Sequence, residues 1–231
     1  MSTNVIGLDE WKLQFDEIGK LKFHNLWEVI RGDRRGIYNS ATDSLVVPIE
    51  YESAAYTYSS ELWQVKKDGL WGLYNSALNT FPIHLEYDDV YETIHLNLWE
   101  VRMGSLYGVY NSATASLVIP AEYDNVYTTN YHAMCIVRKG HVDGLYNLDT
   151  SSFIMPMKYY EIYETNYLNL WMIKKDGKWG LYNSFLKTIV IPVDFDNIDT
   201  TSISSLFQVW VDGSWGVYDA ILSYYLFPLR P

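Results

Sequence analysis

The chain has one cysteine, Cys135, among its 231 residues, and a single cysteine excludes an internal disulfide framework. No apolar run is long enough for a membrane-spanning helix, and residues 1–7 do not combine a basic segment with an apolar core. We therefore expect no membrane span and no secretory signal. Cytoplasmic residence is the default expectation.

Positive charge is also scarce. The sequence has 17 Lys and Arg residues against 28 Asp and Glu residues, which gives a formal net charge of −11. Nucleic acids and anionic membranes bind basic surfaces, so this balance argues against both as partners. It favours a protein partner that carries a basic surface.

Catalytic and cofactor motifs are missing as well. There is no glycine-rich phosphate loop, no Gly-x-Ser-x-Gly motif and no metal-ligand spacing of histidine and cysteine. We expect no enzyme activity, and we assign no catalytic residue, cofactor or metal.

A regular repeat organises what the sequence does contain. Glycine recurs every 36 residues, with no insertion or deletion, at Gly36, Gly72, Gly108, Gly144, Gly180 and Gly216. A tyrosine follows each glycine two residues later, at Tyr38, Tyr74, Tyr110, Tyr146, Tyr182 and Tyr218. A fixed period of this length is typical of solenoids, propellers and related arrays. The unbroken register predicts one domain over residues 1–231.

Tryptophan marks another position of the repeat. Trp27, Trp63, Trp99 and Trp171 each precede a repeated glycine by nine residues, and Cys135 takes this place in the fourth unit. We therefore interpret Cys135 as a buried structural thiol and not as a nucleophile.

The stretch Leu62 to Asn75 predicts a β-hairpin. Its Asp68-Gly69 dipeptide suits a two-residue turn with positive φ angles. Such a turn pairs Trp63 with Tyr74 on one side of the hairpin. On the other side it predicts a cation over an aromatic ring in three units, as Lys66 with Trp71, Arg102 with Tyr107 and Lys174 with Trp179. In the fourth unit Arg138 faces Asp143, an opposite-charge pair.

A third strand and a possible fourth follow each hairpin. Thr188 to Pro192 is apolar and β-branched, and Asp194 to Ile198 comes after it. Proline cannot donate a backbone hydrogen bond, so we expect Pro192 at a sheet edge, a bulge or a strand junction. The pattern predicts an all-β chain.

The sequence resembles the bacterial WG-repeat family, named for Trp-Gly pairs such as Trp71-Gly72 and Trp179-Gly180. The fuller signature Lys-Asp-Gly-Lys-Trp-Gly-Leu-Tyr-Asn stands at residues 175–183. Arg35, Tyr107 and Asp143 depart from it by replacing the tryptophan. The resemblance implies a β-repeat scaffold and no catalytic residues.

Two arrangements of the six units remain open, a closed six-bladed β-propeller and an open β-solenoid. Lys12 to Ile18 aligns with Pro192 to Ile198, so we expect a strand there. The C-terminal segment Tyr224 to Pro228 precedes Lys12 in phase, and the two ends could together complete one blade. This complementarity favours the ring.

Acidic residues recur as pairs two positions apart, and the pairs are Glu50 and Glu52, Glu86 and Asp88, Glu122 and Asp124, and Asp194 and Asp196. On a strand, both carboxylates of a pair point to the same side. One interpretation is a solvated strand face, and another is an acidic band that binds a basic protein. Calcium binding is a third, although no recognised loop spacing is present.

Two function classes follow from these features. In the first, an acidic, inhibitor- or immunity-type protein blocks a basic partner such as a bacterial toxin domain. Tyr91, Tyr127 and Tyr163 recur one unit apart and are candidate contacts, with packing between units as the alternative. In the second, carbohydrate binds to aromatic platforms at the unit junctions. The scattered substitutions favour a single protein interface.

Overall fold

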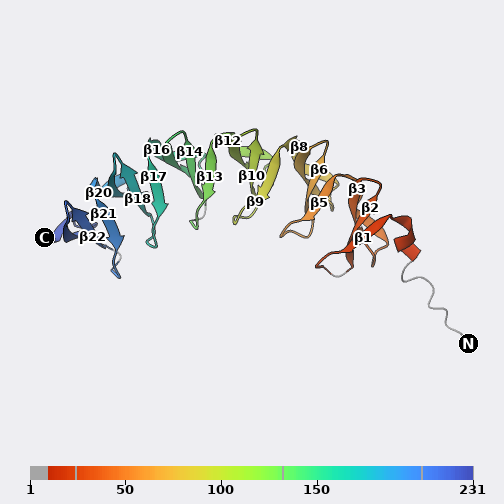
Figure 1. Cartoon of the computed structure of the whole chain (residues 1–231), viewed down its shortest axis with the longest axis horizontal. Coiled ribbons are helices and arrows are strands. Elements are labelled where there is room, and N and C mark those ends of the chain that lie inside the picture. Colours follow the sequence, from red (N-terminus) through yellow and green to blue (C-terminus); the bar gives the residue numbers. More distant parts are fainter. Residues whose placement is uncertain (1–9, 24, 132, 204, 231) are drawn as a thin grey trace, which may run out of the picture. The chain divides into compact units, whose positions relative to one another are not determined.

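The computed structural model describes residues 10–23, 25–131, 133–203 and 205–230. This part of the chain forms 24 strands in six four-stranded sheets, preceded by a short 3-10 helix, η1, at Glu10–Gln14 (Figure 1). Strand order follows chain order within every sheet, from β1-β2-β3-β4 to β21-β22-β23-β24. The all-β prediction with six repeated units is confirmed.

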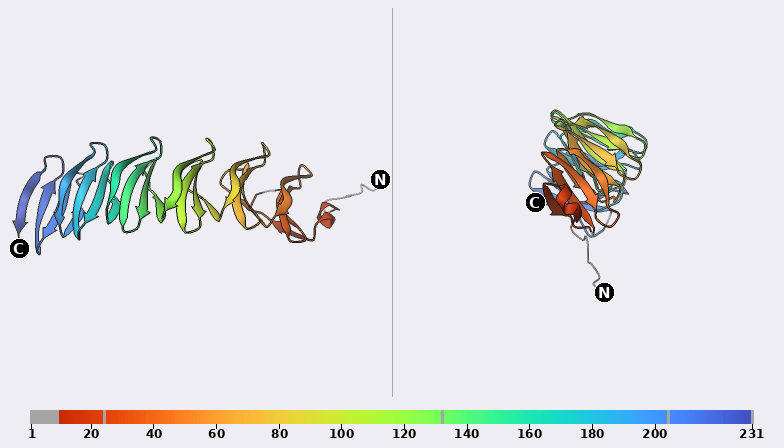
Figure 2. Two further views of the ribbon diagram at one scale, coloured as in Figure 1. Left: turned by 90° about the horizontal axis from the view of Figure 1, so that it is seen from above. Right: turned by 90° about the vertical axis from the view of Figure 1, so that its right-hand side faces the viewer.

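Each sheet contains four kinds of strand that occupy the same places in every repeat (Figure 2). The first strands are β1 (Glu17–Lys20), β5 (Ser53–Tyr56), β9 (Asp89–Glu92), β13 (Asn125–Thr128), β17 (Glu161–Glu164) and β21 (Asn197–Thr200). The second strands are β2 (Leu26–Arg31), β6 (Leu62–Lys67), β10 (Leu98–Met103), β14 (Met134–Lys139), β18 (Leu170–Lys175) and β22 (Leu206–Val211). The third strands are β3 (Arg34–Asn39), β7 (Leu70–Asn75), β11 (Leu106–Asn111), β15 (Val142–Asn147), β19 (Lys178–Asn183) and β23 (Ser214–Asp219). The fourth strands are β4 (Ser44–Tyr51), β8 (Thr80–Tyr87), β12 (Ser116–Tyr123), β16 (Ser152–Tyr159), β20 (Thr188–Phe195) and β24 (Tyr224–Arg230).

The chain divides into two compact units, Met1–Leu117 and Val118–Pro231, with the boundary inside β12. The prediction of one domain over residues 1–231 stays a prediction, and so does closure into a ring.

The predicted hairpin register is confirmed. Trp63 lies opposite Tyr74 and Lys66 lies opposite Trp71 in the pairing of β6 with β7. The φ angles of Asp68 and Gly69 are 53° and 81°, as a turn with two left-handed residues requires. The predicted edge position of proline is also confirmed, because Pro192 belongs to β20 at the end of its sheet.

The repeated glycine is explained by the approach of the fourth strand. The pairing of β7 with β8 shifts register between Trp71 and Leu73, so that a bulge of β8 lies over Gly72. A Cβ atom at Gly72 would lie 2.7 Å from the carbonyl oxygen of Ile83. Gly36 meets the carbonyl oxygen of Val47 at the same distance. At these two glycines backbone occupies the space that a side chain would need, whereas at Gly144 the nearest atoms belong to the side chains of Met157 and Phe153.

The hydrophobic core lies between successive sheets. In the first unit, Ile37 and Val47 of the β1–β4 sheet pack with Trp63 and Val65 of the β5–β8 sheet, and all four are at most 2% exposed. The second unit repeats the arrangement with residues of the β13–β16 and β17–β20 sheets. A sheet therefore buries its apolar face only against its neighbour, as expected for a repeat array.

Aromatic side chains also pack where successive sheets meet. Tyr51, at the end of β4, lies 6.3 Å from Tyr74 of the next sheet, and Phe195 lies 6.2 Å from Tyr218 in the second unit. Burial raises the pKa of Tyr51 well above its usual value, and the neighbouring carboxylate of Glu50 raises that pKa further. Burial and the carboxylate of Glu86 raise the pKa of Tyr87 in the same way.

The N-terminal prediction needs correction. Lys12 belongs to the 3-10 helix η1, and the strand begins only at Glu17. In the described part of the chain no hairpin precedes this segment, so it has no third strand with which to pair. Instead, Trp11 stacks on Tyr38 at 4.8 Å and Phe15 contacts the same ring edge-on at 5.5 Å. The helix covers the face that a preceding sheet covers in later repeats.

The two chain ends do not share a sheet among the residues that the structure describes. β24 pairs with β23, and β1 pairs with β2, so both terminal sheets consist of consecutive strands. Joint completion of one blade by the two ends stays a prediction.

Replacing Gly72 with alanine should lower the free energy of unfolding by about 1–3 kcal/mol, because the new Cβ would clash with the backbone of β8. Gly19→Ala is the matched control, since the nearest atom to its Cβ would be 3.6 Å away. The control should change stability by less than about 0.5 kcal/mol. Urea denaturation of both variants measures the difference, and equal losses would contradict the bulge explanation.

Stability should fall as the pH rises above about 10, where tyrosines of the unfolded chain ionise. Tyr51 has a raised pKa in the folded state and keeps its proton, so it contributes stability below that pH which is lost above it. Tyr51→Phe should reduce the loss by about 1.4 kcal/mol per pH unit. Phenylalanine fits the site, because Phe195 holds the same place in β20. Urea midpoints across this pH range test the prediction, and an unchanged pH slope in the variant would contradict it.

Candidate partner-binding surface

One carboxylate of each predicted acidic pair holds a hairpin turn. Asp88 lies at the junction of β8 and β9, and its Oδ2 atom accepts a hydrogen bond from the backbone amide of Gly104 at 2.5 Å. Its own amide donates to the carbonyl of Arg102 at 2.9 Å. The equivalent acceptors are Glu52 for Gly69 at 3.2 Å, Asp124 for Gly140 at 2.5 Å and Asp196 for Asp212 at 2.7 Å. We call Glu52, Asp88, Asp124 and Asp196 the turn acids.

Asp16 makes the same contact, with the amide of Gly32 at 2.7 Å. The sequence prediction missed it, although Asp16 lies one repeat before Glu52. In the fifth repeat Tyr160 replaces the acid, and only its backbone amide still donates, to the carbonyl of Lys174 at 2.9 Å. The repeated acid is thus first a structural device of the hairpin.

The other carboxylate of each pair faces solvent. Glu50, Glu86, Glu122 and Asp194 lie near the ends of the fourth strands and are all exposed, and we call them the outer acids. Glu50 forms an ion pair with Lys67 at 3.1 Å. Glu86, Glu122 and Asp194 have no ion pair within the described residues. Because the intervening residue of each pair is buried, as Tyr87 is, the outer acids are fixed on the surface by the strand alternation.

Among the turn acids, Asp196 has a lowered pKa. A hydrogen bond from Lys178 lowers the pKa of Asp196, and the backbone amide of Asp212 lowers it further. Asp196 is therefore a carboxylate at neutral pH, and its ion pair with Lys178 offsets its charge.

The predicted pairs on the second face of the hairpins are partly confirmed. Lys66 lies over the ring of Trp71 at 5.6 Å and Lys174 over Trp179 at 4.7 Å. Arg102 differs, because it forms an ion pair with Asp89 and donates to the carbonyl of Gly104 instead of covering Tyr107. A nearby carboxylate outweighs the ring, since a charge-assisted hydrogen bond is stronger than a cation–π contact at an exposed site.

The fourth repeat holds the predicted opposite-charge pair. Arg138 donates from Nε and Nη2 to the two carboxylate oxygens of Asp143 at 2.7 and 2.9 Å. Asp143 is 1% exposed and also accepts from the amide of Ile162. This ion pair is structural and takes the place of the tryptophan of other repeats.

The three candidate tyrosines are exposed, with 47%, 39% and 50% of Tyr91, Tyr127 and Tyr163 accessible. They contact charged neighbours. The guanidinium of Arg138 lies 5.5 Å from the Tyr127 ring, and the Tyr163 hydroxyl donates to Glu161 at 3.0 Å. Packing between repeats does not bury them, so they offer rigid aromatic area to a partner.

Sequence reasoning missed two further carboxylates with a structural role. Glu92 accepts a hydrogen bond from the amide of Tyr58 at 3.1 Å, and Glu164 accepts one from the amide of Asn130 at 3.1 Å. Both bonds join the loop of one repeat to the next repeat. Glu92 and Glu164 lie two repeats apart in the sequence, and this spacing could have indicated their shared structural role.

No catalytic constellation is apparent in the described residues. Cys135 is fully buried, as predicted for a structural thiol. Across the described ranges, no group of three or more His, Cys, Asp or Glu side chains is arranged to hold a metal ion. Within the same ranges, no helix has the length and apolar character required to cross a bilayer.

Comparison with known families identifies the repeat. Residues 36–71 and 107–141 match the family described as "WG containing repeat". The chain contains WG repeats. Both matched segments begin at a repeated glycine or beside it, in β3 and β11, so the matched period is the one that builds the sheets.

Solved structures with some similarity to this WG-repeat chain are remote. Kluyveromyces lactis Hsv2 gives a TM-score of 0.36 at 7% identity, covering 85% of this chain and 71% of that chain. A crystal structure of a eukaryotic initiation factor gives a TM-score of 0.42 at 10% identity, covering 90% of this chain and 62% of that chain. A comparison with curated protein sequences gave no significant match.

The division between turn acids and outer acids can be measured. Asp88→Ala should lower the free energy of unfolding by about 1–2 kcal/mol, because the Gly104 amide loses its charged acceptor. Glu86→Ala, two residues earlier on the exposed strand, should change it by less than about 0.5 kcal/mol. Thermal and urea denaturation compare the two, and equal effects would refute the division.

Proposed function

We propose that this protein is a non-catalytic scaffold that binds a basic protein through its outer acids. The observation that carries the proposal is the recurrence of exposed carboxylates at one position of the fourth strands, as Glu50, Glu86, Glu122 and Asp194, with Lys158 at this position in the fifth repeat. Exposed carboxylates at repeated positions create a negative field that speeds the approach of a basic partner. The turn acids add to this field while they hold the hairpins.

The exposed tyrosines complete the proposed interface. Tyr91 follows Glu86 by five residues, across the short junction from β8 to β9, and Tyr127 follows Glu122 in the same way. Tyrosine provides large contact area with little loss of side-chain entropy. Steering by the acids and contact by the tyrosines together suit a protein that covers a basic surface.

We infer an inhibitor- or immunity-type role, in which binding blocks the active surface of a basic partner such as a bacterial toxin domain. Net charge of −11 supports electrostatic complementarity with such a partner. The mechanism is steric occlusion, so it needs no catalytic group in the scaffold.

Carbohydrate binding has weaker support. It would require accessible aromatic faces at equivalent places in the repeats. Lys66 and Lys174 lie over the rings of Trp71 and Trp179, and Asp143 replaces the aromatic ring in the fourth repeat. These features favour a single protein interface over a set of equal sugar sites.

The test is an affinity capture from the lysate of the source cells at low and high salt, followed by mass spectrometry and kinetics with the purified partner. The triple variant Glu86→Gln, Glu122→Gln and Asp194→Asn should lose a basic protein that the unmodified chain retains. Neutralising three charges of the interface should slow association by about tenfold or more at low salt.

The matched control neutralises three exposed acids at other positions of the repeat, Glu17→Gln, Asp149→Asn and Asp176→Asn. It changes the net charge equally and should keep the partner. Equal loss in both triple variants would mean that net charge alone drives retention, and retention by the first variant would refute the proposed site.

A further inference from the structure

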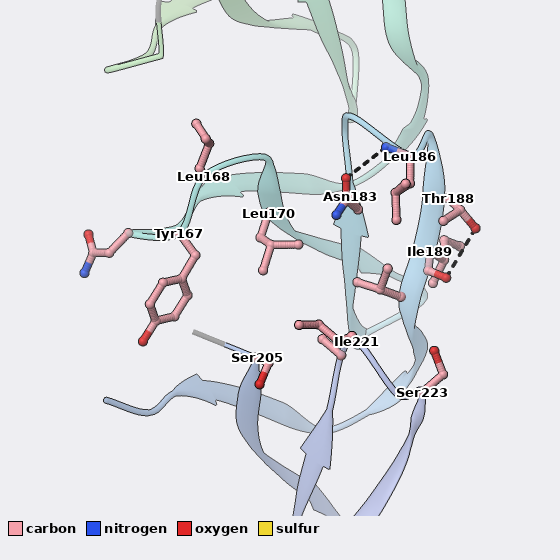
Figure 3. A pocket seen from close by; sticks show the side chains of 13 residues that line it. Tyr167, Leu168, Leu170, Asn183, Leu186, Thr188, Ile189, Ser205, Ile221 and Ser223 are labelled. Atoms are coloured by element: carbon pink, nitrogen blue, oxygen red, sulfur yellow. Dashed lines mark hydrogen bonds between the residues drawn. The ribbon is translucent and has the colours of Figure 1, made fainter. Parts of the chain in front are cut away.

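An apolar groove lies between the β17–β20 and β21–β24 sheets of the second unit. Its volume is about 650 Å³, within the range of small-ligand and side-chain pockets. Leu170, Leu186 and Ile221 converge on its interior (Figure 3). Leu168 and Ile221 on its walls are 72% and 78% exposed, so apolar surface reaches solvent here.

The six repeats serve as an internal comparison for this groove. The place of Leu186 is held by Thr42, Thr114 and Thr150 in three other repeats and by Leu78 and Leu222 in the remaining two. The place of Ile221 is held by Ala41, Ala77 and Ala113. The fold therefore does not require large apolar residues in these turns. Leu186 and Ile221 are nevertheless apolar and exposed to water, which is unfavourable.

The groove also differs from the rest of the surface in charge. None of its lining residues is ionisable at neutral pH, although the whole chain is strongly acidic. Polar groups stand at its rim. The side-chain oxygen of Asn183 accepts from the amides of Phe185 and Leu186, so its Nδ2 donor remains available, and the Ser205 and Ser223 hydroxyls also line the groove.

We propose that this groove binds an uncharged apolar peptide segment of a partner protein. Leucine, isoleucine or phenylalanine side chains of the segment would fill the groove between Leu170, Leu186 and Ile221. The Asn183 amide and the two serine hydroxyls would bond to backbone groups of the segment, which lack charge. An uncharged occupant is required because a charged side chain would lose its hydration there without gaining a counter-ion. The proposal does not depend on the outer acids.

The experiment pans a displayed library of random twelve-residue peptides against the full chain and measures the enriched peptides in solution at low and high salt. Enrichment of uncharged sequences rich in Leu, Ile or Phe, with affinity insensitive to salt, is the expected result. The variant Leu186→Thr with Ile221→Ala should weaken binding by about tenfold or more, because two apolar contacts are lost. Both replacements are residues that other repeats already carry there, so the fold should be retained.

The control variant Leu78→Thr with Ile94→Ala removes comparable exposed apolar surface elsewhere and should leave binding unchanged. Light scattering of all variants reports self-association. No enrichment, enrichment of basic salt-sensitive peptides, or equal binding to the groove variant would overturn the proposal. Loss of a dimer in the groove variant would also overturn it, since a second copy would then be the occupant. Failure here leaves the test of the outer acids unaffected.

Discussion

The structure depends on the packing of each four-stranded sheet against the next. A sheet of this size leaves a whole apolar face open, and residues such as Ile37 and Trp63 are buried only where two sheets meet. The repeated glycine of the third strand leaves room for the close approach of the fourth strand. Aromatic side chains such as Tyr51 and Tyr74 pack where two sheets meet. In the first sheet of the described residues, Trp11 and Phe15 pack on Tyr38, on the face that a preceding sheet covers in later repeats. The 36-residue period of the sequence reflects this packing, because each repeat places the same residue types between sheets.

Within each acidic pair, one carboxylate has a structural role and the other faces solvent. In five of the six repeats a carboxylate at the strand junction turns toward the hairpin amide and holds it, as Asp88 does with Gly104. Two residues earlier, Glu86 is fixed on the outer surface and has no cation within the described chain. Four of the repeats carry this second acid, which the hairpin does not need. The apolar groove of the last two sheets adds a surface that the repeat itself does not require.

Much of the fold could be predicted because short-range rules determine it. The Asp68-Gly69 turn fixes the pairing of Trp63 with Tyr74, and the glycine interval fixes the number of units. Contacts between side chains on different strands were harder to predict. Arg102 could reach either Tyr107 or Asp89, and only the adjacent first strand brings the carboxylate within reach. Lys12 fitted the strand phase, but a strand without a preceding hairpin has no pairing partner. The acidic pairs were visible in the sequence, whereas their division of roles depends on the junction geometry that places Asp88 over a turn.

The central claim is that the outer acids and the first strands beside them form the binding surface of a basic partner. Hydrogen–deuterium exchange of the full chain, alone and saturated with the captured partner, tests it most directly. The account predicts added protection in segments 84–91, 120–127 and 192–199, where the fourth strands end and the next sheets begin. Protection confined to other segments, with these three unchanged, would contradict it.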